Sequence, residues 1–144
     1  MQDRFLFRGK CVDTGRWMEG GYFVHYARQL SPMGDYYKDG DIIHLICQSG
    51  FADWNMPRPI QGIDVVPDTV GQCTGLRDKN GTLIFEGDIC KSIDGLFLIA
   101  WDDKKCAYLM RFHDYPNESL YMEEMWKDSE VIGNIYDNPE LLNG

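Results

Sequence analysis

The segment Asp78-Lys79-Asn80-Gly81 has the residue types of a loop that binds a metal ion or a phosphate group. An EF-hand calcium loop needs oxygen ligands at positions 1, 3 and 5, glycine at 6 and glutamate at 12. Counted from Asp78, glycine falls at position 4 and Ile89 at position 12, so the spacing fails. A phosphate loop needs a longer glycine-rich arc. We therefore predict that Asp78, Asn80 and Gly81 form a turn between two strands.

Two acidic residues bracket a glycine in Glu86-Gly87-Asp88. Paired carboxylates can bind a cation or act as general acid and base. A glycine within a strand pattern usually marks a bulge or bend. We expect Gly87 to have this structural role, and Asp88 to accept backbone N–H bonds where the next strand begins.

The residues best suited to act as general bases are His25, His44 and His113. His44 and Cys47 are three residues apart, so on a strand they point to opposite faces. No Cys-x-x-Cys or His-x₃-His spacing completes a zinc site. His25, Ser31 and Asp41 could be combined into a triad, but no nucleophile elbow accompanies them. We expect no catalytic, metal or cofactor site.

Short apolar runs separated by Gly, Asp and Asn predict antiparallel hairpins. The expected strands are residues 5–12, 17–26, 41–48, 70–76, 83–85, 89–93, 96–101, 106–112 and 130–135. Asp94-Gly95 suits a type I′ hairpin turn. The predicted fold is mainly β with little helix. Its C-terminal half forms a small barrel or rolled sheet of hairpins, and an N-terminal β subdomain precedes it.

Residues 31–40 and 49–60 are predicted loops, because both contain proline and turn residues. We expect one domain, residues 1–144, with a soft subdomain boundary near residues 67–71. Residues 120–126 fit a helical turn and a strand equally well. Residues 138–142 predict a short helix, with Asn138 as its cap and Pro139 at its first position.

The net charge is −9, from 14 basic and 23 acidic residues, which disfavours non-specific binding to nucleic acid. No apolar run approaches the roughly 20 residues of a membrane span. The first residues do not resemble a secretory signal. The five scattered cysteines, an odd number, fit reduced thiols. We therefore expect a cytoplasmic protein without membrane association.

Aromatic residues crowd the first 54 positions, among them Trp17, Tyr22, Phe23, Tyr26, Tyr36, Tyr37, Phe51 and Trp54. Bases of single-stranded nucleic acid stack on such rings when a positive groove accompanies them. The nearby cations are Arg4, Arg8, Lys10, Arg16 and Arg28. Binding of single-stranded nucleic acid by a small β-barrel is therefore the alternative function.

Three long segments also carry a family likeness: "FRGKCVDTGRWMEGGYFV" (7–24), "IDVVPDTVGQCTGLRDKNGTLIFEGDICK" (63–91) and "EVIGNIYDNPELL" (130–142). In this order they resemble the YopX family, whose members are encoded mostly by bacteriophages and prophages. Residues 27–62 and 112–129 match little, so nothing is carried over to them. The resemblance implies a largely β fold and a phage or prophage origin, and it supplies no catalytic residues.

The function expected from these observations is a non-enzymatic protein-interaction module. Its partner would be a phage or host protein, and an enzyme ranks third among the functions considered. We also expect a homo-oligomer whose contact involves residues 27–62, because this segment is rich in Tyr, Trp, Met and Arg. The predicted interface residues are Tyr36, Tyr37, Phe51 and Trp54.

Overall fold

The computed structural model describes residues 3–143, apart from the side chain of Met125. Within these residues the regular structure consists of strands and four short 3₁₀ helices, with no α-helix, and this confirms the predicted mainly-β class. The chain divides into two compact units. The N-terminal unit is Leu6–Val70, and the C-terminal unit joins Gly71 onward to the short segment that ends at Phe5.

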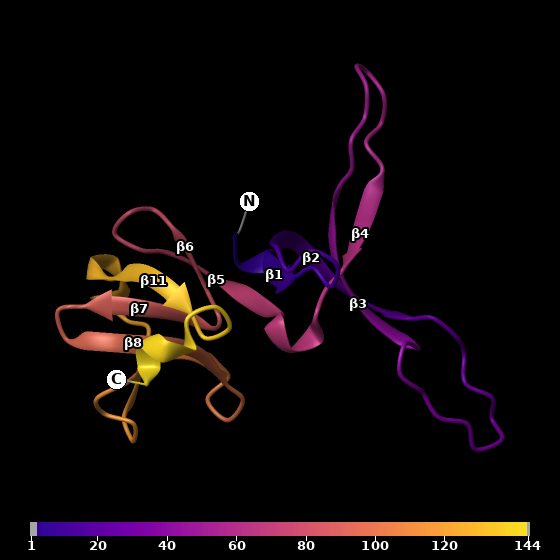
Figure 1. Ribbon diagram of the computed structural model, residues 1–144. Helices are drawn as coiled ribbons and strands as arrows, with labels where there is room; N and C mark the ends of the chain where they lie inside the picture. The colour runs from indigo at the N-terminus through magenta and orange to yellow at the C-terminus, as the bar shows by residue number, and fades with distance from the viewer. Residues whose placement is uncertain (1–2, 144) are drawn as a thin grey trace. The chain divides into compact units, whose positions relative to one another are not determined.

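The N-terminal unit is an antiparallel sheet in which neighbouring strands follow one another along the chain (Figure 1). Its strands are β1 (Phe7–Lys10), β2 (Trp17–Tyr26), β3 (Ile42–Ser49) and β4 (Ile60–Asp64), and the 3₁₀ helix η2 (Pro67–Thr69) follows them. The first three agree with predicted strands. β4 was not predicted, because Gly62 interrupts its apolar alternation and Pro57 and Pro59 precede it.

The core of the N-terminal unit is small and depends on close backbone approach. Ile46 and Val65 are almost fully buried. A Cβ atom at Gly9 would stand 3.0 Å from the Val65 Cβ, and one at Gly20 would stand 2.2 Å from the Cys47 carbonyl oxygen. These two glycines therefore let neighbouring elements approach more closely than a side chain would allow.

The C-terminal unit contains a five-stranded antiparallel sheet in the order β10-β9-β8-β7-β11, together with the β5–β6 hairpin. Its strands are β5 (Gly71–Arg77), β6 (Leu83–Phe85), β7 (Asp88–Ser92), β8 (Gly95–Asp102), β9 (Ala107–Phe112), β10 (Ser119–Tyr121) and β11 (Glu130–Asn134). Of the two predicted forms, a barrel or a rolled sheet, the barrel is wrong, because the sheet is not closed. Closure fails because β11 pairs with β7, which leaves β10 and β11 at opposite edges.

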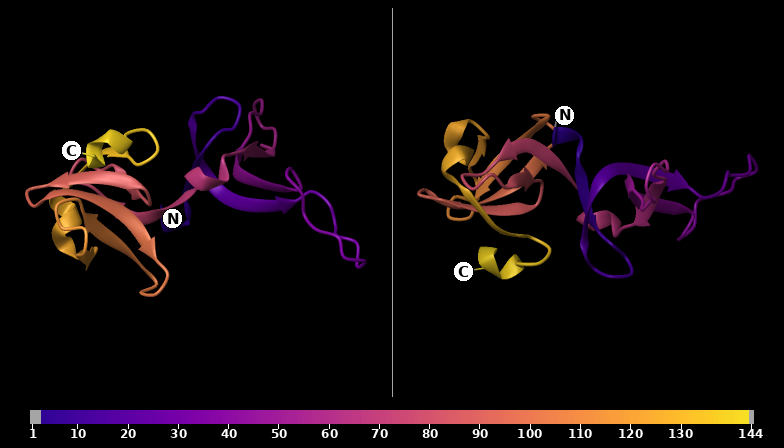
Figure 2. Two further views of the ribbon diagram at one scale, coloured as in Figure 1. Left: turned by 60° about the horizontal axis from the view of Figure 1, so that its bottom comes forward. Right: turned by 90° about the horizontal axis from the view of Figure 1, so that it is seen from above.

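One face of this sheet forms the main apolar core. The buried residues of the core cluster are Ile84, Cys90, Phe97, Ile99, Met110 and Phe112. The rings of Phe97 and Phe112 lie 5.3 Å apart, and Leu76 and Trp126 pack against the cluster. The segment that follows β11 turns back beside the sheet (Figure 2). Its residue Tyr136 lies next to Gly87, where a Cβ atom would stand 3.1 Å from the tyrosine ring.

Several local predictions for the C-terminal unit need correction. Residues 119–128 contain a strand and then a helical turn, because β10 ends at Tyr121 and the 3₁₀ helix η3 spans Glu124–Asp128. The terminal helix η4 (Pro139–Leu142) is a 3₁₀ turn with Pro139 at its start, as expected. Asn138 does not cap it through its side chain; its Oδ1 accepts the Asn134 N–H at 3.3 Å instead.

The turn between β7 and β8 also differs from the predicted type I′ turn at Asp94-Gly95. Ser92 pairs with Gly95, so the two central residues are Ile93 and Asp94. Gly95 has φ +121° and is the first residue of β8, whereas Asp94 is not among the residues with positive φ. Gly95 therefore follows the two central residues of the turn, whereas the predicted type I′ turn made it the second of them.

Candidate interaction site

The β3–β4 loop, residues 50–59, projects from the N-terminal unit as a narrow hairpin (Figure 1). Its base is fixed because the Gly50 N–H donates to the Pro59 carbonyl oxygen at 2.7 Å. Near its tip the Met56 N–H donates to the Asp53 carbonyl oxygen at 3.1 Å, and Asn55 has φ +61°. The loop is therefore a turn with internal hydrogen bonds rather than a free connection.

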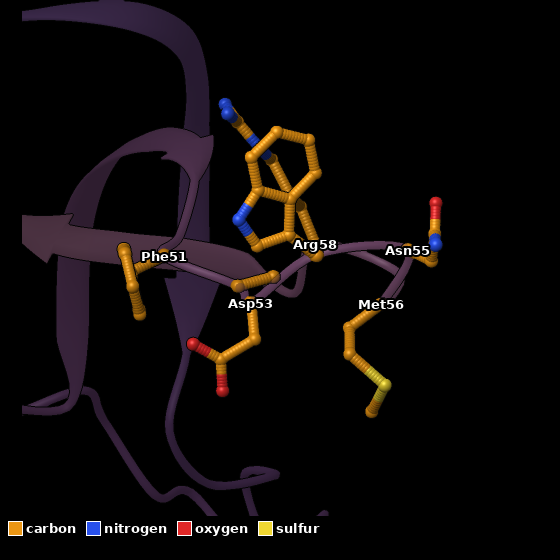
Figure 3. Close-up of a pocket in the computed structure, with 7 residues that line it drawn as sticks. Phe51, Asp53, Asn55, Met56 and Arg58 are labelled. Carbon is orange, nitrogen blue, oxygen red and sulfur yellow. The ribbon is translucent and has the colours of Figure 1, made fainter.

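Three large apolar side chains of this loop lie in the open. Trp54 is 94% exposed, Phe51 87% and Met56 63%. Together with Asp53 and Arg58 they line a shallow hollow (Figure 3). Asp53 and Met56 extend to one side of the loop, and Arg58 extends to the other. Clusters of exposed apolar residues rimmed by polar ones mark interaction sites.

The β2–β3 loop, residues 27–41, is organised around Arg28. The Arg28 guanidinium donates to Asp35 Oδ2 at 2.6 Å and to Asp41 Oδ2 at 2.7 Å, and it also donates to the Tyr36 carbonyl oxygen. The hydrogen bond from Arg28 lowers the pKa of Asp35 to about 2. The Lys38 backbone N–H, more than Arg28, lowers the pKa of Asp41. This loop is thus held in one shape by charged hydrogen bonds.

The four predicted interface residues do not form one patch. Tyr36 and Tyr37 lie on the β2–β3 loop, whereas Phe51 and Trp54 lie on the β3–β4 loop, and these loops leave opposite ends of β3 (Figures 1 and 2). Tyr36 is 77% exposed. Tyr37 is less exposed, at 39%, and its ring lies 5.3 Å from that of Tyr26. The β3–β4 loop therefore holds the denser set of exposed apolar side chains.

Two residues of the β3–β4 site were not singled out from the sequence. Met56 and Arg58 flank Pro57, and Pro59 follows them. Two prolines so close together prevent a continuous strand and keep neighbouring side chains outside the sheet. The spacing of these two prolines could therefore have predicted from the sequence that Met56 and Arg58 are exposed to solvent.

The cations predicted to accompany the aromatic residues do not form one group. The Arg8 guanidinium lies 4.6 Å from the ring centre of Trp17, and Lys10 Nζ lies 5.5 Å from it. Arg28 is engaged by Asp35 and Asp41, as described above. The local cationic surface of the N-terminal unit therefore centres on the β1–β2 pair.

The side-chain carboxylate of Asp78 holds the β5–β6 turn in place through hydrogen bonds. Asp78 Oδ1 accepts the N–H groups of Asn80 at 2.8 Å and Thr82 at 2.9 Å, and Oδ2 accepts the Val131 N–H at 2.9 Å. Burial opposes ionisation, but these three hydrogen bonds outweigh it and lower the pKa of Asp78. Gly81 has φ +82°. The carboxylate thus joins the β5–β6 turn to β11.

Glu86, Gly87 and Asp88 lie at the tight connection between β6 and β7. Gly87 has φ +89°, and a Cβ there would stand 3.1 Å from Tyr136. Asp88 is buried, and its Oδ2 accepts the Phe85 N–H at 2.8 Å. Burial raises the pKa of Glu86. The two carboxylates therefore have different environments, and that of Asp88 is structural.

The candidate catalytic residues have other hydrogen-bond partners. Asp41 binds Arg28, and Ser31 Oγ accepts the Met33 N–H at 3.4 Å. His44 Nδ1 is hydrogen-bonded to the Tyr22 hydroxyl. Among residues 3–143, no three His, Cys, Asp or Glu side chains gather as a metal site, and no helix has the length and apolar character needed to cross a membrane.

The geometry describes a mainly-β protein that presents a rigid aromatic loop. The family model described as "YopX protein" matches residues 25–143, so the chain belongs to the YopX family. The match includes residues 27–62, where the segments quoted above gave little, and it excludes the segment 7–24. A comparison with curated protein sequences gives no match.

Proposed function

We propose that this YopX-family protein is a non-enzymatic, phage- or prophage-encoded interaction module of the bacterial cytoplasm. It binds a phage or host protein through the β3–β4 loop. The observation that carries the proposal is the exposure of Trp54, Phe51 and Met56 on a loop whose base and tip are hydrogen-bonded.

The energetics favour a protein partner. Fully burying a large apolar side chain contributes roughly 1.5–3 kcal/mol. Binding energy at protein interfaces concentrates in a few residues, with Trp, Tyr and Arg enriched among them. Because the loop is already hydrogen-bonded at Gly50–Pro59, little ordering entropy is lost when a partner covers Trp54.

The loop also specifies the partner's surface. Trp54 and Phe51 need an apolar groove, and Asp53 and Arg58 at the edge of the hollow need polar groups around it. Nucleic acid would supply phosphates instead, and within this loop Arg58 is the one cationic residue and the acidic Asp53 accompanies it. A concave apolar protein surface is the better complement.

Affinity capture with the purified full chain tests the proposal. The double variant Phe51→Ala/Trp54→Ala is compared with wild type and with Ile93→Ala, which removes a side chain 96% exposed on the β7–β8 turn. We expect the same protein to be captured by wild type and Ile93→Ala, and at least about tenfold less by the double variant, given hot-spot costs of 2 kcal/mol or more. Equal capture by all three would contradict the proposal.

Binding of single-stranded nucleic acid is the second candidate, and the stacking of Arg8 and Lys10 on Trp17 favours it. Filter binding of a labelled single strand at increasing salt separates the two functions. Nucleic-acid binding predicts retention that falls steeply with salt and is lost in Trp17→Ala. The protein-interaction proposal predicts little retention at physiological salt.

A further inference from the structure

β4 is the outer strand of the N-terminal sheet, and two hydrogen bonds define which of its residues face β3. The Gly50 N–H donates to the Pro59 carbonyl oxygen at 2.7 Å, and the Val65 N–H donates to the His44 carbonyl oxygen at 2.9 Å. Hydrogen-bonded pairs alternate along an antiparallel ladder. The backbone groups of Ile60, Gly62 and Asp64 therefore point away from β3.

This outer edge is open along two of these residues. The Asp64 carbonyl oxygen accepts the Val12 N–H at 3.0 Å. Among residues 3–143, none bonds to the outward N–H and C=O groups of Ile60 and Gly62. Ile60 is 86% exposed, and Arg58 and Asp64 are exposed as well. Open edges of this kind pair with strands of other chains.

We propose that a second copy of this chain pairs antiparallel with β4 about a two-fold axis at Gln61. This register places Ile60 of each copy opposite Gly62 of the other, so their outward groups form four hydrogen bonds. Gly62 has no side chain there, and Leu45 Cδ1 lies 3.1 Å from where its Cβ would stand. The exposed Ile60 side chain of one copy thus packs over Gly62 onto Leu45 of the other.

Charge complementarity selects the same register. Three positions from the axis, Arg58 of one copy comes to the end of the strand where Asp64 of the other lies, and the symmetry does so twice. Because Val12 occupies the backbone position beside Asp64, the two charged residues approach each other through their side chains alone. Moving the axis by one residue removes both charge pairs and places two Ile60 side chains or two Gly62 residues against each other. The edge is therefore self-complementary in shape and charge only with the axis at Gln61.

The pairing does not rest on the proposed function, because Phe51 and Trp54 take no part in it. It gives the expected homo-oligomer a specific contact whose hydrogen-bonded residues, Ile60 and Gly62, lie within residues 27–62. Only two residues of each strand pair, since Val12 already occupies the next position. We therefore expect a reversible dimer whose population rises with concentration across the micromolar range.

Light scattering during size-exclusion chromatography tests the register through charge reversal. Arg58→Glu alone and Asp64→Arg alone each place like charges together twice, so each should weaken dimerisation at least about tenfold. An equimolar mixture of the two variants restores both opposite-charge pairs and should dimerise like wild type. Asp39→Arg makes the same charge change on the β2–β3 loop and should have no effect.

A cysteine at the axis gives a second measurement. Directly opposed residues at a non-hydrogen-bonded position have Cβ atoms about 4.5–5.5 Å apart, close enough for a disulfide after a small shift. Gln61→Cys in a Cys106→Ser background should cross-link on mild oxidation, whereas Ile93→Cys should not. A single 16.7 kDa species in wild type at all concentrations would overturn the proposal. So would dimers that persist in both charge variants, or dimers that Gln61→Cys fails to cross-link.

Discussion

Asp78 joins two parts of the C-terminal unit through one buried carboxylate. It accepts N–H groups from its own turn and from Val131 of β11, and the Lys79 N–H adds a bond to the Ser129 carbonyl oxygen at 3.0 Å. Replacing a buried acceptor that has several donors lowers the free energy of unfolding. Each N–H group left without an acceptor has lost its hydrogen bonds to water on burial and gains no other bond in return. At the residue scale, the conspicuous DKNG segment stabilises the fold.

The pH dependence of stability should report this role. The folded-state pKa of Asp78 lies below its ordinary 3.8, so the ionised carboxylate stabilises the fold above that pH. This contribution is lost as pH falls through the folded-state pKa. Asp78→Asn removes the acceptor for Val131 and should cost about 1–3 kcal/mol at neutral pH.

Urea unfolding of wild type and Asp78→Asn at pH 7 and below pH 3.8 measures the effect. The gap between the two free energies of unfolding should shrink on acidification, since protonated Asp78 loses the same acceptor. A gap that stays constant with pH would show that the carboxylate charge does not stabilise the turn.

Gly81 provides a separate residue-scale prediction. Its φ is +82°, and a Cβ there would meet no atom within 4 Å. Gly81→Ala should therefore cost about 1 kcal/mol from backbone strain alone. Chemical denaturation gives the value, and an unchanged midpoint would contradict it. Calcium and magnesium should not move the midpoint, whereas a metal-dependent rise would make this turn a ligand site.

At the element scale, hairpin patterns were informative where turn residues and apolar alternation agree. The strands at 17–26 and 83–85 were predicted with the observed bounds. β4 was missed because Gly62 and the flanking prolines weaken its pattern. The barrel was wrong because strand order is set by long-range pairing, here of β11 with β7. The residues of a strand and its turns do not show which edge of the sheet a later strand will pair with.

The same limit applies to the candidate site. The aromatic content of residues 27–62 predicted exposed side chains, and Trp54 and Phe51 are indeed exposed. It did not reveal that Tyr36 lies at the other end of β3 from Trp54. The two residues are separated because the eight residues of β3 between them form an extended strand. The distance between the two residues therefore depends on the folded strand and not on the aromatic content of the segment.

The strands also determine how the five thiols react. None of them forms a disulfide: Cys73 and Cys90 are buried, Cys11 and Cys47 are half-buried, and Cys106 is exposed. Alkylation without reductant should give five adducts in denaturant, counted by mass spectrometry. In the native protein Cys106 should react first and Cys90 of β7 among the last. Disulfide-linked peptides in fresh protein would contradict the reducing compartment that we expect.

At the scale of the whole molecule, the two units have separate cores. Ile46 and Val65 form the centre of the N-terminal unit, and the Phe97 cluster forms that of the C-terminal unit. A small core is more sensitive to one substitution, because fewer remaining contacts can offset the loss. The loops of the N-terminal unit therefore depend on a few buried side chains for their position.

Hydrogen exchange followed by mass spectrometry can separate the two cores. Ile46→Ala should cost about 2–5 kcal/mol and should speed exchange mainly in peptides from residues 6–70. Ile93→Ala is the control, since this isoleucine is 96% exposed and takes no part in either proposed contact. Uniform acceleration over residues 71–143 would show that the chain unfolds as one cooperative body.

The central claim is that the β3–β4 loop contacts a protein partner, and site-specific photo-cross-linking tests it most directly. A photoreactive phenylalanine analogue is placed at position 54, or at the equally exposed position 93 as control. Both proteins are expressed in cells that contain the phage or prophage, and the adducts are identified by mass spectrometry. We predict one predominant protein adduct from position 54 and none of that protein from position 93. Adducts of the same identity and yield from both positions would contradict the claim.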